Sequence, residues 1–193
     1  WASLMASMWP VDGVIAENGG LSFLRRDGAV ERRFFDGGRP DLETLSQTLR
    51  AEFPELEPAD DQPYRETSLA FRRLPSPEAN RRVLDALPRL GAAGTVNSLW
   101  LLAWPGVWDK LSMAQKVLSQ DHGQDFAAAR HGILYVGDSH NDQIMFANLP
   151  HTVGVSTVVE HDLDAWPRWI TKGPGGAGFV EVAERLIAAR QWP

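Results

Sequence analysis

Residues 132–137 (GILYVG) form an apolar run without polar alternation, and Asp138 follows directly after it. Such a run is typical of a parallel strand that is buried on both faces of a sheet. Ligands of open α/β sheets bind in the crevice beyond the carboxyl ends of these strands. The pattern therefore predicts an α/β layer with a polar site at Asp138.

Short strand and helix patterns alternate around that strand, as expected of an α/β layer. The glycine-rich residues 173–178 (GPGGAG) lack the Lys-Ser/Thr pair of a P-loop, and we interpret them as a turn before the last helix. The layer is predicted to contain strands at 11–16, 151–156 and 168–172 and helices at 110–120 and 179–190.

Residues 20–107 have a different organisation, in which strands and helices suit an antiparallel sheet covered on one face. Asp27-Gly28 predicts a two-residue hairpin loop within residues 21–35. We expect this α+β module to be inserted into the layer, which would comprise residues 1–19 and 108–193. The module is predicted to continue with a helix from Asp41 to before Pro54, a strand at 64–73, a helix at 77–90 and one strand at 95–104.

Polar residues gather directly after Asp138, where Ser139, Asn141 and Asp142 precede the next predicted helix. Magnesium prefers carboxylate oxygens, takes one or two of them from protein, and completes its shell with water and substrate phosphate. Backbone N–H groups at a helix start also attract anions. The loop suits a cation and phosphate site, but the same residue types lead at helix caps, so spacing alone leaves both interpretations open.

Lys110 and Asn18 are further candidates. We expect Asp109 to cap the helix at 110–120, which places Lys110 in a first turn where the helix dipole slightly disfavours a cation. A lysine that faces the same crevice as Asp138 could neutralise a transferring phosphoryl group. A solvated surface lysine is the commoner alternative. Asn18 would also face the crevice, although turn formation alone accounts for Asn18-Gly19-Gly20.

Composition excludes several classes of function. The sequence has no cysteine, which excludes a disulfide framework, a thiolate zinc site and a cysteine nucleophile. Its net charge of −6 argues against a nucleic-acid surface. No apolar run approaches the roughly 20 residues that cross a bilayer, and the first residues lack the pattern of a secretory signal. We expect a cytoplasmic protein with no nucleic-acid or membrane partner.

Four segments of the chain carry a recognisable pattern, namely VIAENGG (14–20), WDKLSMAQ (108–115), YVGDSHNDQIMF (135–146) and GAGFVEVAERLI (176–187). Together they resemble the haloacid dehalogenase superfamily, and more narrowly its type IIB, or Cof-like, sugar-phosphate phosphatases. The specific part is the GDSxND signature within residues 135–146. The resemblance implies an α/β fold, with a Rossmann-like core and an inserted α+β cap of the C2 type at residues 20–107.

The resemblance also implies an activity, namely magnesium-dependent hydrolysis of a phosphate monoester through an aspartyl-phosphate. Sucrose-phosphate and mannosylglycerate-phosphate phosphatases are relatives of this kind, so the expected substrate is a small phosphorylated metabolite, in particular a sugar phosphate. The implied roles are metal binding for Asp138 and Asp142, phosphate pairing for Lys110, and phosphate or substrate binding for Ser139, Asn141 and Asn18. Substrate selectivity would come from cap residues such as Arg65 and the region 97–98.

The sequence departs from the family at one essential point. Members carry a DxDxT/S strand with the nucleophile and the general acid/base, followed by a Ser/Thr strand that binds phosphate, and this sequence contains neither. Asp12 precedes Gly13 without a second aspartate and does not replace the motif. We expect the nucleophile to lie upstream, the N-terminal core strands to be missing, and the chain alone to be inactive. The alternatives are a non-catalytic module or truncated domain of a sugar-transferring enzyme, and a phosphomutase of the same superfamily.

Overall fold

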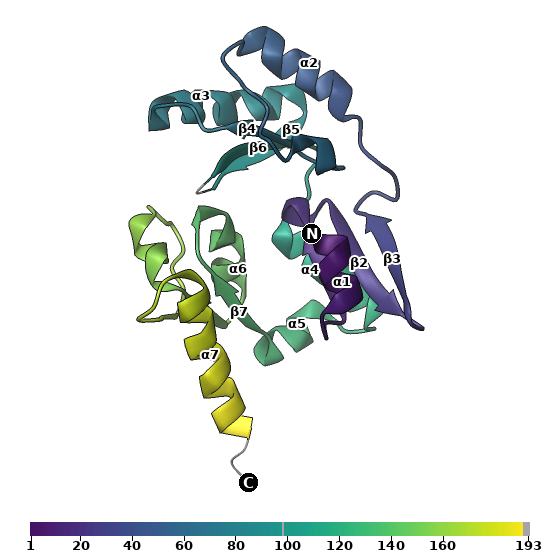
Figure 1. The fold of residues 1–193 in the computed structure, drawn as a ribbon, viewed down its shortest axis with the longest axis vertical. Helices are drawn as coiled ribbons and strands as arrows, with labels where there is room; N and C mark the ends of the chain where they lie inside the picture. Colours follow the sequence, from purple (N-terminus) through teal and green to yellow (C-terminus); the bar gives the residue numbers. More distant parts are fainter. Residues whose placement is uncertain (98, 191–193) are drawn as a thin grey trace. The chain divides into compact units, whose positions relative to one another are not determined.

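The structure is a computed structural model that describes residues 1–97 and 99–190. The chain divides into two compact units, Trp1–Val117 and Leu118–Pro193, which we describe separately (Figure 1). The predicted division into residues 1–19, 20–107 and 108–193 stays a prediction. None of the described helices is long and apolar enough to cross a membrane.

The first sheet of unit 1 is antiparallel, with strands in the order β1-β2-β3. Asp27 and Gly28 both have positive φ in the tight turn between β2 and β3, so the hairpin predicted from Asp-Gly is confirmed. Helix α1 precedes the sheet, and the Arg25 guanidinium of β2 donates to the carbonyl oxygens of Ala6, Ser7 and Trp9. These elements are α1 (Ala2–Met8), β1 (Gly13–Ala16), β2 (Leu21–Arg26) and β3 (Ala29–Phe34).

The strand predicted at 11–16 forms as β1, but its partner differs from the expected one. β1 pairs antiparallel with β2, from Gly13 opposite Leu24 to Ala16 opposite Leu21. We expected this strand to join the parallel layer, and within the described residues it does not. The physical reason is the short turn formed by η1 (Glu17–Gly19) and Gly20, because a turn of this length joins antiparallel neighbours whereas parallel strands need a long crossover.

The second sheet of unit 1 has the antiparallel order β4-β6-β5 and is covered by α2 and α3 (Figure 1). Its core contains Leu49 of α2, Phe71 of β4, Val83 of α3 and Leu101 of β6. The helix-covered antiparallel sheet predicted for the module is therefore present for its later strands, but the hairpin at 21–35, expected in the same module, pairs with β1 in the first sheet instead. The elements are α2 (Leu42–Glu52), η2 (Gln62–Tyr64), β4 (Leu69–Arg72), α3 (Pro77–Ala86), η3 (Leu87–Leu90), β5 (Ala92–Val96) and β6 (Trp100–Pro105).

Two strand predictions in this unit were wrong in extent. The run at 95–104 is not one strand, because the Asn97 side chain accepts the backbone N–H groups of Leu99 and Trp100 and turns the chain between β5 and β6. Ser98, part of the predicted selectivity region, lies outside the described residues. The strand expected at 64–73 begins only at Leu69, because residues 66–68 are bound by a carboxylate instead of a neighbouring strand.

Unit 2 contains a parallel sheet with the order β7-β8-β9, which confirms the predicted alternation of strands and helices. Its core includes Phe146, Val158 and Leu163, with Tyr135 packed against them. Helix α4 (Lys110–Asp121) spans the boundary between the two units. The elements of unit 2 are α5 (Phe126–Ala129), η4 (Arg130–Gly132), β7 (Leu134–Gly137), η5 (His140–Asp142), α6 (Gln143–Asn148), β8 (His151–Gly154), η6 (Ser156–Glu160), β9 (Trp169–Ile170) and α7 (Gly175–Arg190).

Two expectations for unit 2 need correction. β7 is only partly buried along Leu134, Tyr135 and Val136, because it is the first strand of the described sheet and not a central one. The last helix begins at Gly175, so most of the stretch expected to be a turn is helical. A Cβ at Gly178 would lie 2.5 Å from the Thr171 hydroxyl oxygen, so glycine at this position permits close packing of α7.

Candidate functional site

The loop after β7 carries the acidic residues that the sequence singled out. Asp138 follows the last strand residue, Gly137, and its side chain is exposed at the carboxyl end of the strand. Ser139 is buried, and its hydroxyl contacts Asp138 Oδ1 at 3.2 Å and Asn141 Oδ1 at 2.7 Å. Asp138, Ser139 and Asn141 thus form one polar group at the strand end.

The buried Asp142 side chain holds the backbone of this loop through hydrogen bonds. Asp142 is 2 % exposed, and its Oδ2 accepts the backbone N–H groups of Asp138 at 2.8 Å and Ser139 at 3.1 Å. The Tyr135 hydroxyl donates to the other oxygen, Oδ1, at 2.5 Å. Burial raises the pKa of Tyr135, and the adjacent Asp142 charge raises it further, so this hydroxyl remains a donor. Asp142 therefore fixes the backbone from which the Asp138 side chain projects.

The position of the Asp142 side chain also requires a glycine at residue 137. A Cβ at this position would lie 2.7 Å from Cβ and Cγ of Asp142, closer than real Cβ atoms approach. Any larger residue would push Asp142 away from the two backbone N–H groups that it accepts. The Gly-Asp pair of the signature thus has a steric basis in this structure.

The donor set of this loop fits a hard cation in part. Among the described residues there is no cluster of three or more His, Cys, Asp or Glu side chains that could hold a metal ion. Magnesium commonly takes only one or two protein carboxylates and fills its remaining positions with water and phosphate oxygens. The exposed Asp138 carboxylate suits that role, whereas the Asp142 carboxylate is already engaged by three donors.

Lys110 begins α4 in unit 1, as predicted. Asp109 caps the helix reciprocally with Ser112: the Ser112 backbone N–H donates to Asp109 Oδ1 at 2.7 Å, and the Asp109 N–H donates to the Ser112 hydroxyl at 2.8 Å. Lys110 is half-buried in the first turn. The cap holds this end of α4 in one conformation, which fixes the origin of the lysine side chain.

The turn that contains Asn18 lies against the same end of α4. Glu17, Asn18 and Gly19 all have positive φ, at 48°, 54° and 104°. Non-glycine residues rarely adopt such values, and strain of this kind collects at functional sites. A Cβ at Gly19 would lie 2.1 Å from the Asp109 carbonyl oxygen, so glycine permits the close approach. The structure therefore brings the Asn18 turn and the start of α4 together.

Glu17 is a residue that the sequence did not single out, and it explains how the strained turn is held. Its Oε1 accepts the backbone N–H of Glu66 at 2.9 Å. Its Oε2 accepts the backbone N–H and the hydroxyl of both Thr67 and Ser68, at 2.8–3.1 Å. Thr67 and Ser68 are fully buried. We call Glu17 together with residues 66–68 the Glu17 anchor.

Sequence alone offered little signal for the anchor, because its two halves lie 49 to 51 residues apart. The available clue was an acidic residue directly before an Asn-Gly-Gly turn. Gly20 is part of the same fit, since a Cβ there would lie 2.1 Å from the Thr67 hydroxyl oxygen. The turn and the buried hydroxyls are thus closely packed.

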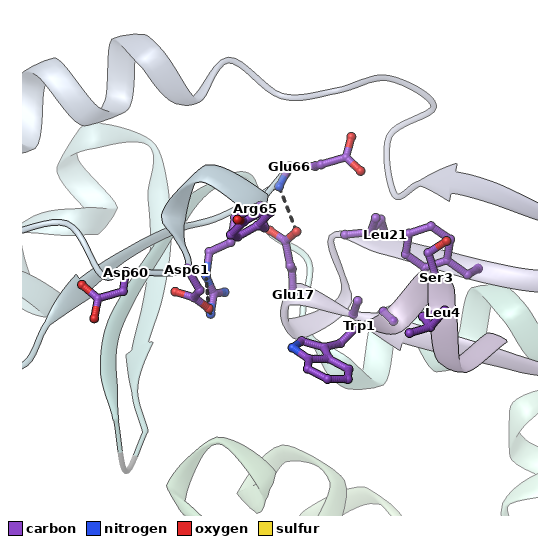
Figure 2. Close-up of a pocket in the computed structure, with 13 residues that line it drawn as sticks. Trp1, Ser3, Leu4, Glu17, Leu21, Asp60, Asp61, Arg65 and Glu66 are labelled. Carbon is purple, nitrogen blue, oxygen red and sulfur yellow. Dashed lines mark hydrogen bonds and ion pairs between the residues drawn. The ribbon is translucent and has the colours of Figure 1, made fainter. Parts of the chain in front are cut away.

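An open pocket of about 870 Å³ lies beside the anchor within unit 1. Figure 2 shows Glu17 at its centre, with Arg65 and Asp61 on one side and α1 residues on the other. The Arg65 side chain is 16 % exposed and donates from Nε and Nη2 to Asp61 Oδ2 at 3.2 and 2.7 Å. Its third contact runs from Nη1 to the Ser68 hydroxyl at 3.2 Å. Arg65, which sequence proposed for selectivity, therefore lines a pocket.

The predicted site residues fall into two groups. Asn18 and Lys110 lie in unit 1, and the structure brings their segments together. The residues of the GDSxND loop lie in unit 2, where they surround the end of β7. The roles assigned to the individual residues stay predictions: Lys110 for phosphate pairing, Asp138 and Asp142 for metal, and Ser139, Asn141 and Asn18 for phosphate or substrate.

Comparisons with known proteins find similarity in structure but not in sequence. No protein-family model matches the sequence. No curated protein matches it either. Among solved structures, protein 0175 of Thermoplasma acidophilum aligns with a TM-score of 0.68 and 18% identity, over 94% of this chain and 76% of that one.

Two further structures are described as phosphatases of the haloacid dehalogenase superfamily. The subclass IIB sugar phosphatase BT4131 aligns with a TM-score of 0.64 and 13% identity, over 91% of this chain and 76% of its own. The phosphatase BT1666 from Bacteroides thetaiotaomicron aligns with a TM-score of 0.62 and 18% identity, over 91% and 74%. These similarities confirm the α/β fold expected from the sequence motifs. The chain has the fold of the haloacid dehalogenase phosphatases, including their subclass IIB sugar phosphatases.

Proposed function

We propose that this chain carries the metal-binding loop, the phosphate-pairing lysine and the substrate-facing turn of a magnesium-dependent sugar-phosphate phosphatase. The observation that carries the proposal is the GDSxND loop. There an exposed aspartate stands at the carboxyl end of a parallel strand, and a buried aspartate fixes its backbone. This is the position at which α/β sheets bind ligands. The similarity of the fold to a sugar phosphatase supports the substrate class.

In this proposal Asp138 is the direct ligand of the metal. A bound magnesium ion would neutralise charge that develops on the phosphoryl group. Asp142 serves the same loop by holding the Asp138 and Ser139 backbone, which agrees with its burial and its three hydrogen bonds. Ser139 and Asn141 limit the motion of the Asp138 carboxylate through the shared hydroxyl.

Lys110 and Asn18 act on the substrate in this proposal. The Lys110 ammonium pairs with a phosphoryl oxygen, which lowers the cost of the negative charge in the transition state. Asn18 offers an amide that can both donate to phosphate oxygens and accept from a sugar hydroxyl. The cap at Asp109 and the close packing at Gly19 support these roles, since both limit the motion of the segments concerned.

The nucleophile is not among the motifs of these 193 residues. Hydrolysis through an aspartyl-phosphate needs a carboxylate that attacks phosphorus while the ester P–O bond breaks and the alcohol takes a proton. We propose that this carboxylate lies upstream in the complete gene product. The acidic net charge favours a small phosphorylated metabolite over a nucleic acid as substrate. A cytoplasmic location, where sugar phosphates are made and consumed, is part of the proposal.

A panel of sugar monophosphates tests this function with the complete gene product. Phosphate release is measured for hexose, pentose and disaccharide phosphates, each with magnesium and with excess chelator. We expect release from at least one sugar phosphate, abolished by the chelator and restored by added magnesium. Absence of release from the whole panel, or release that the chelator leaves unchanged, would contradict the proposal.

A non-catalytic binding module is the second candidate, and the absence of a DxDxT/S motif from this sequence favours it. Such a module would bind the same sugar phosphates without hydrolysing them. Calorimetric titration of the panel, run in parallel with the release assay, distinguishes the two: binding with no product indicates the module.

A further inference from the structure

The Glu17 anchor joins two segments that are far apart in the sequence. On one side stands the turn 17–20, with three consecutive residues at positive φ. On the other stand residues 66–68, whose three backbone N–H groups and two hydroxyls all point at one carboxylate. Hydrogen bonds to a charged acceptor are roughly twice as strong as neutral ones. The anchor therefore compensates for the strain of the turn and fixes residues 66–68 at the same time.

The anchor continues into the Arg65 side chain through one hydroxyl. Ser68 Oγ donates to Glu17 Oε2 at 2.8 Å and accepts from Arg65 Nη1 at 3.2 Å. The opposite edge of the guanidinium is held by Asp61 Oδ2. A planar guanidinium held at both edges has little freedom to rotate. Arg65 is consequently fixed in one orientation on the pocket wall, as Figure 2 shows for its contact with Asp61.

We propose that Glu17 is a positioning residue for substrate discrimination: through Ser68 it orients Arg65, which contacts the sugar part of the substrate in the pocket. The inference rests on the proposed function. Glu17 itself does not contact substrate in this account, because both of its carboxylate oxygens are occupied by residues 66–68. Its effect is on which phosphate esters the enzyme prefers.

The charges around the pocket indicate what Arg65 recognises. Asp61 already balances the guanidinium charge, Glu66 pairs with Arg32 at 2.8 Å, and Asp60 pairs with Arg72 at 2.9 Å. Arg65 is the only Lys or Arg among the described residues that line the pocket, and its charge is compensated. This wall suits uncharged hydroxyl groups better than a second anionic group. Arg65 is thus expected to bind sugar hydroxyls and not an additional phosphate.

A matched pair of esters tests the inference on the complete gene product. One is the hexose phosphate hydrolysed fastest in the panel, and the other is 4-nitrophenyl phosphate, which has no sugar hydroxyls. In Glu17→Gln, kcat/KM for the hexose phosphate should fall about tenfold or more, chiefly through KM, because a displaced contact group misaligns the sugar. The value for 4-nitrophenyl phosphate should fall less, so that the ratio of the two kcat/KM values drops at least about fivefold, because this ester meets the Asn18 turn but has no sugar hydroxyl for Arg65 to bind. Ser68→Ala should also lower the ratio of kcat/KM for the hexose phosphate to kcat/KM for 4-nitrophenyl phosphate, but by less than Glu17→Gln does.

Glu57→Gln is the control, because Glu57 lies in the same unit with its side chain 75 % exposed. It should leave both esters unchanged. The positioning role would be overturned if Glu17→Gln lowered kcat/KM equally for both esters. It would also be overturned if the variant had a lower melting temperature but an unchanged ratio of the two kcat/KM values. Glu17 would then have only a structural role.

Amide hydrogen exchange separates this inference from the proposed function. The N–H groups of residues 66–68 should be protected in the wild type and exchange at least about tenfold faster in Glu17→Gln, since they lose a charged acceptor. Unchanged protection would contradict the anchor itself. If the wild-type protein hydrolyses neither ester, the proposed function is overturned, and with it the substrate role of Arg65. The amide hydrogen exchange of residues 66–68 would still decide whether Glu17 holds them.

Discussion

Glu17 in unit 1 and Asp142 in unit 2 hold two loops by the same chemistry but over different sequence distances. Each carboxylate accepts neighbouring backbone N–H groups and at least one hydroxyl. Each stands close to a candidate residue, Asn18 beside Glu17 and Asp138 four positions before Asp142. Asp142 acts within its own loop, whereas Glu17 reaches partners about 50 residues away.

This difference in sequence distance determines which other residues are affected when one of the two loops is changed. The Asp142 loop is local, so its conformation depends on one strand end and one short helix. The Glu17 anchor couples the turn at Asn18 to the pocket wall at Arg65, so a change on either side affects the other. In the proposed function, the loop in unit 2 supplies Asp138 as the metal ligand, and the pocket wall in unit 1 affects substrate preference.

Asp142→Ala gives the largest expected effect on stability. It leaves two backbone N–H groups and the Tyr135 hydroxyl without their acceptor, and the loss should destabilise the folded protein by about 3 kcal/mol. Urea unfolding of the complete gene product measures this change, and amide exchange at Asp138 and Ser139 should accelerate with it. Asp162→Ala, an exposed aspartate of the same unit, is the control.

If the comparison is right, Asp142→Ala leaves the amide protection of residues 66–68 unchanged, because the acceptor of those N–H groups is Glu17, which belongs to unit 1. Equal stability of Asp142→Ala and Asp162→Ala would show that Asp142 does not hold the loop.

Tyr135→Phe should have a smaller effect, which depends on pH. Removing one hydrogen bond to a buried carboxylate costs about 1–2 kcal/mol at pH 8. Because the folded protein raises the pKa of Tyr135, the wild type keeps this advantage below the ordinary tyrosine pKa of about 10 and loses it as the pH rises further. Urea unfolding at pH 8 and pH 10.5 should therefore show a narrowing gap between the two proteins.

Tyr64→Phe is the matched control for this prediction, since Tyr64 is the only other tyrosine and is 86 % exposed. It should not change stability at pH 8. A gap between wild type and Tyr135→Phe that stays constant across the two pH values would contradict the assigned role of the hydroxyl.

Local patterns made much of this fold predictable from the sequence. Asp27-Gly28 specifies its hairpin, Asp41 caps α2 by accepting the Thr44 N–H, and the apolar run before Asp138 forms β7. The GDSxND loop was predictable for the same reason, because Tyr135, Asp138 and Ser139, which donate to the Asp142 carboxylate, lie within seven residues of it. Local hydrogen bonding and side-chain periodicity leave direct signals in sequence.

Contacts between distant segments account for what the sequence did not predict. The pairing of β1 with β2 follows from the strained turn at Glu17–Gly19, which in turn depends on residues 66–68. The split of one predicted strand into β5 and β6 follows from the side chain of Asn97. Arg65 could be named from the sequence, but its orientation depends on Glu17 through Ser68. Propensity and spacing contain no information about such partners.

Phosphate release by Asp138→Asn tests the central claim most directly. The variant keeps the size of the side chain but removes the charge that would bind magnesium, and because Asp138 is exposed the fold should be unaffected. With the complete gene product and the best sugar phosphate of the panel, we predict that magnesium-dependent release falls at least about 100-fold, whereas Asp162→Asn retains wild-type release. Wild-type release by Asp138→Asn at the same magnesium concentration would contradict the account.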